Sequence, residues 1–259
     1  MLENDSQRRP WTRDELLAAI NLYCKMPFGR IHIRNPEIIE LATLLGRTPG
    51  AVSWKLANFA SIDENLDRKG AANVSNLDRA VWAEFFADWD GMVFESERRM
   101  AALKQKPLEE VAREQADAEG EEIVIPEGKT REAVVRLRVN QGFFRRTVLS
   151  SYDGACCITG LAVAELLVGS HIVPWVADAR NRTNPRNGLC LNVLHDKAFD
   201  RGLIAVDEGN RVLVSSRVRK LGLEQARAVL EVEGAALRMP RRFLPEPGLL
   251  AWHREYVFN

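Results

Sequence analysis

The stretch from residue 166 to residue 203 constrains the fold more than any other part of this 259-residue chain. Two short apolar runs, at residues 166–172 and 189–191, are predicted to be strands. Pro174 ends the first run because proline cannot donate a hydrogen bond into a strand ladder. Asn192 is a residue type that caps helices, and it precedes a short helical pattern. The sequence therefore predicts two short strands followed by a helix.

Polar side chains fall at the ends of these predicted elements. His171 closes the first strand, Asn187 precedes the second, and Asp196 and Asp200 follow on the helix. Because residues four positions apart share one face of a helix, the two carboxylates can converge on one ion. His195 is rotated by about 100° from Asp196 and cannot easily join them.

This set of residues matches the needs of phosphodiester cleavage, which are a base, a cation and groups that hold both in place. His171 is the predicted base, because an imidazole titrates near neutral pH. Asp196 and Asp200 are the predicted ligands of Mg²⁺ or Mn²⁺, which carboxylate oxygens favour over zinc. We expect the Asn187 amide to bridge backbone groups so that His171 keeps its tautomer. Nearby arginines can grip flanking phosphates, namely Arg180, Arg182, Arg186 and Arg201.

Each of these residues alone also has a structural interpretation. A histidine after a strand is often a satisfied structural residue, and two aspartates one turn apart usually form a solvated helix face. Their joint order and spacing favour the site.

Three sequence blocks in this region resemble the motif blocks of the HNH endonuclease family, in its restriction-type subgroup. They are S-H-I-V-P-W, N-P-R-N-G-L-C-L and H-D-K-A-F-D-R-G-L-I, and the resemblance covers about residues 131–215. It implies a ββα-metal fold with His171 as general base, Asn187 as central asparagine, and Asp196 and Asp200 as metal ligands. Many members carry a metal-binding Asp or His immediately before the base, where this chain has Ser170. A hydroxyl is a weaker ligand, so Ser170 and His195 both remain candidate ligands.

The first 62 residues predict a group of helices. One helix spans about residues 11–26, a second opens at Pro36 and stops at Gly46, and a third is capped by Thr48. Helix, tight turn and helix is the helix-turn-helix pattern. Four polar residues are expected near the exposed side of the third helix, namely Arg47, Ser53, Lys55 and Asn58, with Arg47 and Lys55 as DNA contacts. The alternative is a corner of a helical bundle that contacts no DNA.

The organisation expected from these patterns is α+β, with an N-terminal all-helical domain and a C-terminal nuclease domain. Residues 1–94 are the expected DNA-binding or targeting domain, and residues 95–129 an acidic, partly helical linker. Residues 130–259 hold the nuclease domain, which includes a predicted hairpin around residues 204–214.

The charge is unevenly distributed along the chain. Residues 1–128 hold 16 Lys and Arg against 23 Asp and Glu, whereas residues 129–259 hold 20 against 13. A basic domain attracts polyanions, so the C-terminal half is the better candidate for binding nucleic acid. Basic and aromatic residues interleave in residues 130–151, where Arg145 and Arg146 are predicted DNA contacts; a solvated basic helix face is the alternative.

Composition excludes other classes of protein. No apolar run approaches the roughly 20 residues of a membrane span, and no signal segment opens the chain, so a cytoplasmic protein is expected. The 4 cysteines are too few and too poorly spaced for a disulfide framework or a four-cysteine zinc site.

These observations predict a metal-dependent DNA endonuclease of restriction or phage-defence type, with cutting that depends on base modification as one form of it. One alternative is a DNA-binding regulator with a degenerate nuclease site, and another is a nuclease for RNA or structured nucleic acid. A single HNH site cuts one strand, so double-strand cleavage would need two sites, most simply in a homodimer.

Overall fold

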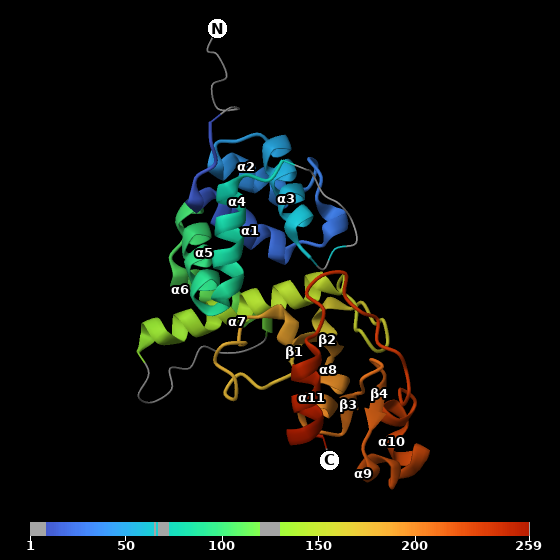
Figure 1. Ribbon diagram of the computed structural model, residues 1–259. Coiled ribbons are helices and arrows are strands. Elements are labelled where there is room, and N and C mark those ends of the chain that lie inside the picture. Colours follow the sequence, from blue (N-terminus) through green and yellow to red (C-terminus); the bar gives the residue numbers. More distant parts are fainter. Residues whose placement is uncertain (1–8, 65, 67–72, 120–129, 259) are drawn as a thin grey trace. The chain divides into compact units, whose positions relative to one another are not determined.

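The computed structural model describes residues 9–64, 66, 73–119 and 130–258. The chain divides into two compact units, Met1–Phe143 and Phe144–Asn259. The division falls inside one continuous helix, α7 (Arg131–Ser151), rather than at the expected domain boundary after residue 129. Figure 1 shows both units, and the four strands of the described chain all belong to the second.

The N-terminal unit is built around helix α1 (Arg13–Lys25). Every residue from Glu15 to Cys24 is buried, and the helix contacts α2, α3, α4 and α5. A helix that is apolar almost all round its axis has to be surrounded in this way. The helices that accompany it are α2 (Pro36–Leu45), α3 (Pro49–Ile62), α4 (Asn76–Ala87), α5 (Trp89–Leu103) and α6 (Leu108–Glu119), with a 3₁₀ turn at Phe28–Arg30.

The predicted helix ends are confirmed where local chemistry sets them. Thr12 and Glu15 form a capping box at the start of α1, and Thr48 Oγ accepts from the Ala51 amide at the start of α3. Gly46 ends α2 with φ of 59°, a left-handed conformation that favours glycine. Whether α2 and α3 read DNA as a helix-turn-helix stays a prediction.

The segment expected to be an acidic linker is helical as far as the structure describes it. Helix α5 extends into it to Leu103, and α6 follows to Glu119. Ala112 of α6 packs against Val135 and Val139 of α7. The end of the expected linker, residues 120–129, lies outside the described residues.

The C-terminal unit contains the predicted order of strand, strand and helix. Strand β1 (Leu167–His171) pairs antiparallel with β2 (Gly188–Asn192), and α8 (Val193–Asp200) follows directly. The side chain of Asn192 caps α8 by accepting from the His195 amide at 2.9 Å. The remaining elements are β3 (Ile204–Val206), β4 (Val212–Val214), α9 (Ser216–Arg219), α10 (Gly222–Leu230), α11 (Pro247–Tyr256) and 3₁₀ turns at Ala164–Leu166 and Pro185–Asn187. The predicted hairpin is the antiparallel pair β3 and β4.

Strands β1 and β2 lie close against the C-terminal part of α7. A side-chain carbon added to Gly188 would lie 2.4 Å from Val148 Cγ2 and 3.0 Å from Phe144 Cζ. The bare backbone of Gly188 therefore lets the helix approach the strand. Around this contact lies a core that includes Leu189, Leu191 and Phe199. Among the described helices, none is both long and apolar enough to cross a membrane.

Candidate active site

The sheet brings the ends of β1 and β2 together at His171. This residue is the register partner of Gly188, and the Ile172 amide donates to the Asn187 carbonyl at 2.9 Å. The expected base and the expected central asparagine therefore lie at the same end of the two strands. Ser170 immediately precedes His171 on β1.

The imidazole of His171 is held on three sides. Its ring stacks on Phe144, with centroids 3.7 Å apart and planes at 9°, and it lies nearly perpendicular to the Trp175 ring, with centroids 5.5 Å apart. Its Nε2 lies 2.9 Å from the carbonyl oxygen of Arg182. Because a carbonyl can only accept, Nε2 must carry the proton, and in a neutral ring Nδ1 keeps its lone pair.

Burial keeps this imidazole neutral. It lowers the pKa of His171 from 6.5 to about 4, against a smaller opposing effect of the Arg182 carbonyl. At neutral pH the ring therefore carries no charge, and Nδ1 is available as a base.

The Asn187 side chain joins the two ends of the loop between β1 and β2. Its Nδ2 donates to the carbonyls of Val173 at 3.0 Å and Asn181 at 3.2 Å, and its Oδ1 accepts from the Val173 amide at 2.8 Å. This is the backbone bridging expected for Asn187 from the sequence. A part in catalysis stays a prediction.

Asp196 and Asp200 form a pair of interacting carboxyl groups on α8. Burial raises the pKa of the half-buried Asp196. The Asp200 side chain is exposed at the surface, and the partial burial of its carboxyl group and the charge of Asp196 both raise its pKa. Ser170 and Lys197 act in the opposite direction on Asp196. Two carboxylates that resist ionising side by side are stabilised in their charged form by a cation between them.

Ser170 contributes an unsatisfied oxygen next to this pair. The residue is 2% exposed, and its Oγ lies near Asp196 without reaching hydrogen-bond geometry to any described residue. A buried hydroxyl without a partner costs free energy unless a ligand or water uses it. Two carboxylates and the Ser170 hydroxyl beside them fit a hard divalent ion, which completes its shell with water and phosphate oxygens. No group of three His, Cys, Asp or Glu side chains that could hold a metal occurs in the described part of the chain.

His195 makes hydrogen bonds within the protein. It is 2% exposed; its Nδ1 accepts from Asn192 Nδ2 at 3.1 Å, and its Nε2 lies 3.4 Å from the Ala228 carbonyl. Both ring nitrogens have protein partners in this conformation, so neither is left to bind a metal. Burial tends to raise the pKa of the Cys156 thiol, but hydrogen bonds from His195 and Thr159 outweigh it and lower the pKa to about 6.

The arginines expected at phosphates are held to different degrees. Arg182 Nε donates to the Trp175 carbonyl at 2.8 Å, Arg145 Nη2 to the Leu167 carbonyl at 2.9 Å, and Arg186 Nε to the Leu244 carbonyl at 3.4 Å. These three side chains are half-buried, whereas Arg146, Arg180 and Arg201 are exposed. The latter three are the better placed to meet a polyanion.

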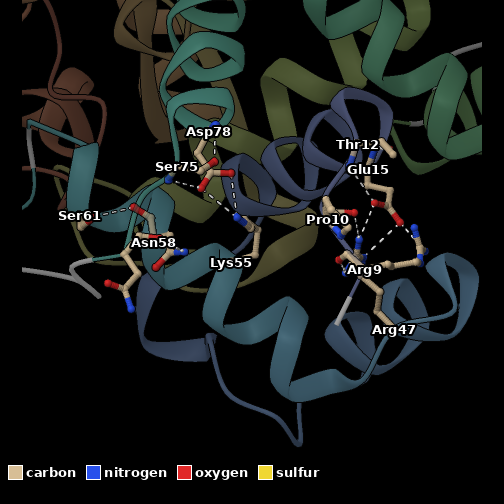
Figure 2. Close-up of polar contacts among 11 residues, drawn as sticks. Arg9, Pro10, Thr12, Glu15, Arg47, Lys55, Asn58, Ser61, Ser75 and Asp78 are labelled. Carbon is tan, nitrogen blue, oxygen red and sulfur yellow. Dashed lines mark hydrogen bonds and ion pairs between the residues drawn. The ribbon is translucent and has the colours of Figure 1, made fainter. Parts of the chain in front are cut away.

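The expectation that Arg47 and Lys55 are exposed is wrong. Figure 2 shows both side chains turned toward carboxylates of other helices. Arg47 is 8% exposed and lies 2.8 Å from Glu15 Oε2, and Lys55 is 6% exposed and lies 2.8 Å from Asp78 Oδ1. Asn58 is buried as well and donates to the Asn73 carbonyl. These residues join α1, α3 and α4, and no DNA contact is proposed for them.

Sequence reasoning missed the residues that hold His171. Phe144 lies in α7, far from the strand in sequence, and the Arg182 contact is made by a backbone carbonyl. Every residue has a backbone carbonyl, so residue type does not indicate which carbonyl accepts a hydrogen bond. The aromatic character of Trp175, four residues after the base, was the one available signal.

Comparison with known proteins gives one family match and a similar solved structure. Residues 156–207 match the family model described as HNH endonuclease, so the C-terminal half of the chain contains an HNH endonuclease domain. A solved structure of a modification-dependent TagI restriction endonuclease is similar at 20% identity and a TM-score of 0.34, over 45% of this chain and 38% of that one. The present chain thus corresponds to well under half of that protein. No curated protein matches.

Proposed function

We propose that the protein is a metal-dependent DNA endonuclease of restriction type. The observation that carries the proposal is the fixed, neutral His171, whose Nδ1 keeps a lone pair because Nε2 donates to Arg182. Ser170, which precedes His171 on β1, interacts with the carboxylate of Asp196, and Asp196 interacts with Asp200. A base beside a cation site is the arrangement that hydrolysis of a phosphodiester requires.

In the proposed reaction, His171 takes a proton from the attacking water at Nδ1. Phe144 and Trp175 hold the ring plane, and Asn187 holds the loop that carries the Arg182 carbonyl. Asp196 and Asp200, with Ser170, would hold a Mg²⁺ or Mn²⁺ ion. The ion supplies positive charge that stabilises the phosphate and leaving oxygens.

DNA is the proposed substrate because exposed cations accompany the site. Arg146, Arg180 and Arg201 lie in the same unit as His171, and all three are exposed. Phosphate contacts of this kind position a duplex without reading its sequence. The N-terminal helical unit is proposed to target the nuclease, with recognition of modified bases as one form of targeting.

The proposal is tested by cleavage of supercoiled plasmid with Mg²⁺, Mn²⁺ or chelator. Wild type should cut only with a divalent ion, and Asp196→Asn or Asp200→Asn should slow cutting by about tenfold to hundredfold. Asp207→Asn, in the turn between β3 and β4, is the matched control and should cut as wild type does. Unmodified and cytosine-modified plasmids should be compared in parallel, because a difference between them reveals modification dependence.

A second candidate function is a DNA-binding regulator whose nuclease site has decayed. The observation in its favour is Ser170, an uncharged residue where many HNH enzymes have a charged or imidazole ligand. It predicts that the wild type retards DNA in a gel without cutting under any divalent ion. Cutting that disappears in Asp196→Asn would reject this alternative.

A further inference from the structure

The loop between β1 and β2 contains four Asp or Asn residues at regular three-residue intervals. They are Asp178, Asn181, Asn184 and Asn187, and hydrogen bonds connect them in series. Asp178 Oδ2 accepts from Asn181 Nδ2 at 2.6 Å, and Asn181 Oδ1 accepts from Asn184 Nδ2 at 2.8 Å. Asn187 Nδ2 then donates to the Asn181 carbonyl at 3.2 Å. We call this series the Asx ladder.

The direction of donation in the Asx ladder is set at its two ends. Asp178 is a carboxylate and can only accept, which orients the Asn181 amide with its nitrogen toward Asp178. At the other end, Asn184 Oδ1 accepts from the Arg186 amide at 3.0 Å, which leaves Asn184 Nδ2 as the donor to Asn181. Asp178 Oδ1 also accepts from the amides of Arg180 at 3.0 Å and Asn181 at 3.3 Å. The hydrogen bonds to Asn181 and Arg180 lower the pKa of Asp178, so the carboxylate stays ionised.

The Asx ladder flanks, on both sides in the sequence, the residue whose backbone carbonyl fixes the tautomer of His171. The carbonyl of Arg182 accepts from His171 Nε2, and it lies between Asn181 and Asn184 in the chain. The Arg182 side chain is also fixed, because its Nε donates to the Trp175 carbonyl and its guanidinium lies 5.7 Å from the centroid of the Trp175 ring.

The middle of this loop has little hydrophobic packing, although Ile172 and Val173 at its start and Pro185 near its end are buried. Pro174, Val176, Ala177, Ala179 and Arg180 are exposed, and Val176 is 86% exposed. An exposed stretch of this kind is ordinarily mobile unless other contacts hold it. Side-chain to backbone bonds of Asp and Asn are the usual means of ordering such a segment.

We propose that Asp178, Asn181 and Asn184 are positioning residues, which hold the Arg182 carbonyl so that His171 keeps its proton on Nε2 and its lone pair on Nδ1. None of the three touches the reacting atoms. The proposal rests on the function proposed above, because it assigns the Asx ladder a role in aiming the base of that reaction.

A swap of two side chains tests the proposal. Asp178→Asn places an amide nitrogen opposite the Asn181 nitrogen, and Asn181→Asp places two carboxylates against each other. The double variant Asp178→Asn with Asn181→Asp restores every bond with the donor and acceptor exchanged, at unchanged net charge. Each single variant should lower kcat by roughly tenfold with little change in KM for DNA, because His171 loses its fixed orientation and tautomer while the phosphate contacts remain. The double variant should recover to within about threefold of wild type.

A second readout does not depend on activity. Two-bond ¹H–¹⁵N NMR of the histidine side chains, assigned with His171→Gln, reports which ring nitrogen carries the proton. Wild type and the double variant should show the Nε2–H form of His171, whereas each single variant should show a mixture. Asp207→Asn, which retains an acceptor for the Arg211 amide in an exposed turn, controls for loss of a carboxylate and should change neither readout.

The outcomes separate the two proposals. Single variants with wild-type kcat and tautomer, or a double variant as impaired as the singles, would overturn the positioning role. If a single variant fails to fold, a folded and active double variant still supports the role, and an inactive double overturns it. A wild type that cuts no DNA sinks the proposed function instead, and the NMR comparison then still decides whether the Asx ladder fixes His171.

Discussion

Two histidines, one half-buried and one buried, show how residue environment decides chemistry. His171 and His253 each have a pKa lowered to about 4 by burial, and each stacks on a phenylalanine. His171 is only half-buried and closes a strand, whereas His253 is 2% exposed and donates from Nε2 to the Phe199 carbonyl at 3.0 Å. The first has the surroundings of a base, and the second supports the packing of α11.

The burial of His253 predicts an acid-sensitive C-terminal unit. Between pH 6.5 and about 4 the unfolded chain protonates this histidine while the folded chain does not, so stability falls as pH drops through that window. The expected loss is on the order of 3 kcal/mol. His253→Phe keeps the stacking and should reduce the dependence of the unfolding free energy on pH, measured by urea denaturation, by the contribution of one histidine, while that of His171 remains. Tyr256→Phe on the same helix is the control, and an equal slope in His253→Phe would contradict the prediction.

Among the helices and strands, the features that depend on local sequence could be predicted, and those that depend on tertiary contacts could not. Caps and helix stops depend on neighbours within four residues, so Thr12, Gly46 and Asn192 were recognisable from sequence. The partners of Arg47 and Lys55 lie on other helices, and no local pattern indicated them. At the site, the sequence predicted β1, β2, α8 and their polar residues. It did not predict the stacking of Phe144 on His171 or the hydrogen bond to the Arg182 carbonyl, because both depend on tertiary contacts.

The buried pair between α3 and α4 should matter more for stability than surface pairs. Lys55 Nζ lies 2.8 and 2.9 Å from the two oxygens of Asp78, which is 0% exposed. Asp78→Ala leaves a buried ammonium without a partner and should cost about 3–5 kcal/mol in the free energy of unfolding. Glu110→Ala breaks an exposed pair with Lys106 and should cost less than about 1 kcal/mol. Equal losses in urea denaturation would refute the distinction.

Gly188 links the packing of β2 to the position of the base. An added methyl would press on Val148 and on Phe144, and Phe144 is the ring that stacks on His171. Gly188→Ala should therefore destabilise the protein by about 1–3 kcal/mol and slow DNA cleavage as well. Gly248→Ala on α11 is the control, because its new methyl meets nothing within 4 Å. Thermal unfolding and plasmid cutting of both variants give the comparison, and unaffected cleavage by Gly188→Ala would argue against the link.

At the scale of the whole molecule, the chain combines a helical unit with a unit that contains one HNH domain. One such site acts on one strand at a time. Nicked circles should therefore precede linear DNA in plasmid cleavage, and the rate of linearisation should rise more steeply than the first power of protein concentration, as expected for a dimer. Analytical ultracentrifugation at the same protein concentrations measures whether the protein is a monomer or a dimer. A monomer that cuts both strands in a concerted step would be incompatible with this expectation.

The proposed function depends on His171 acting as the base of a metal-dependent DNA endonuclease. Its most direct test is the single-turnover rate of plasmid nicking by wild type and His171→Ala, with Mg²⁺ and with Mn²⁺. Exposed His32→Ala serves as the matched histidine control, and circular dichroism confirms that each variant is folded. Loss of general-base catalysis should slow nicking by about 10²–10⁴-fold in His171→Ala alone. Nicking by folded His171→Ala at the wild-type rate would show that His171 is not the base.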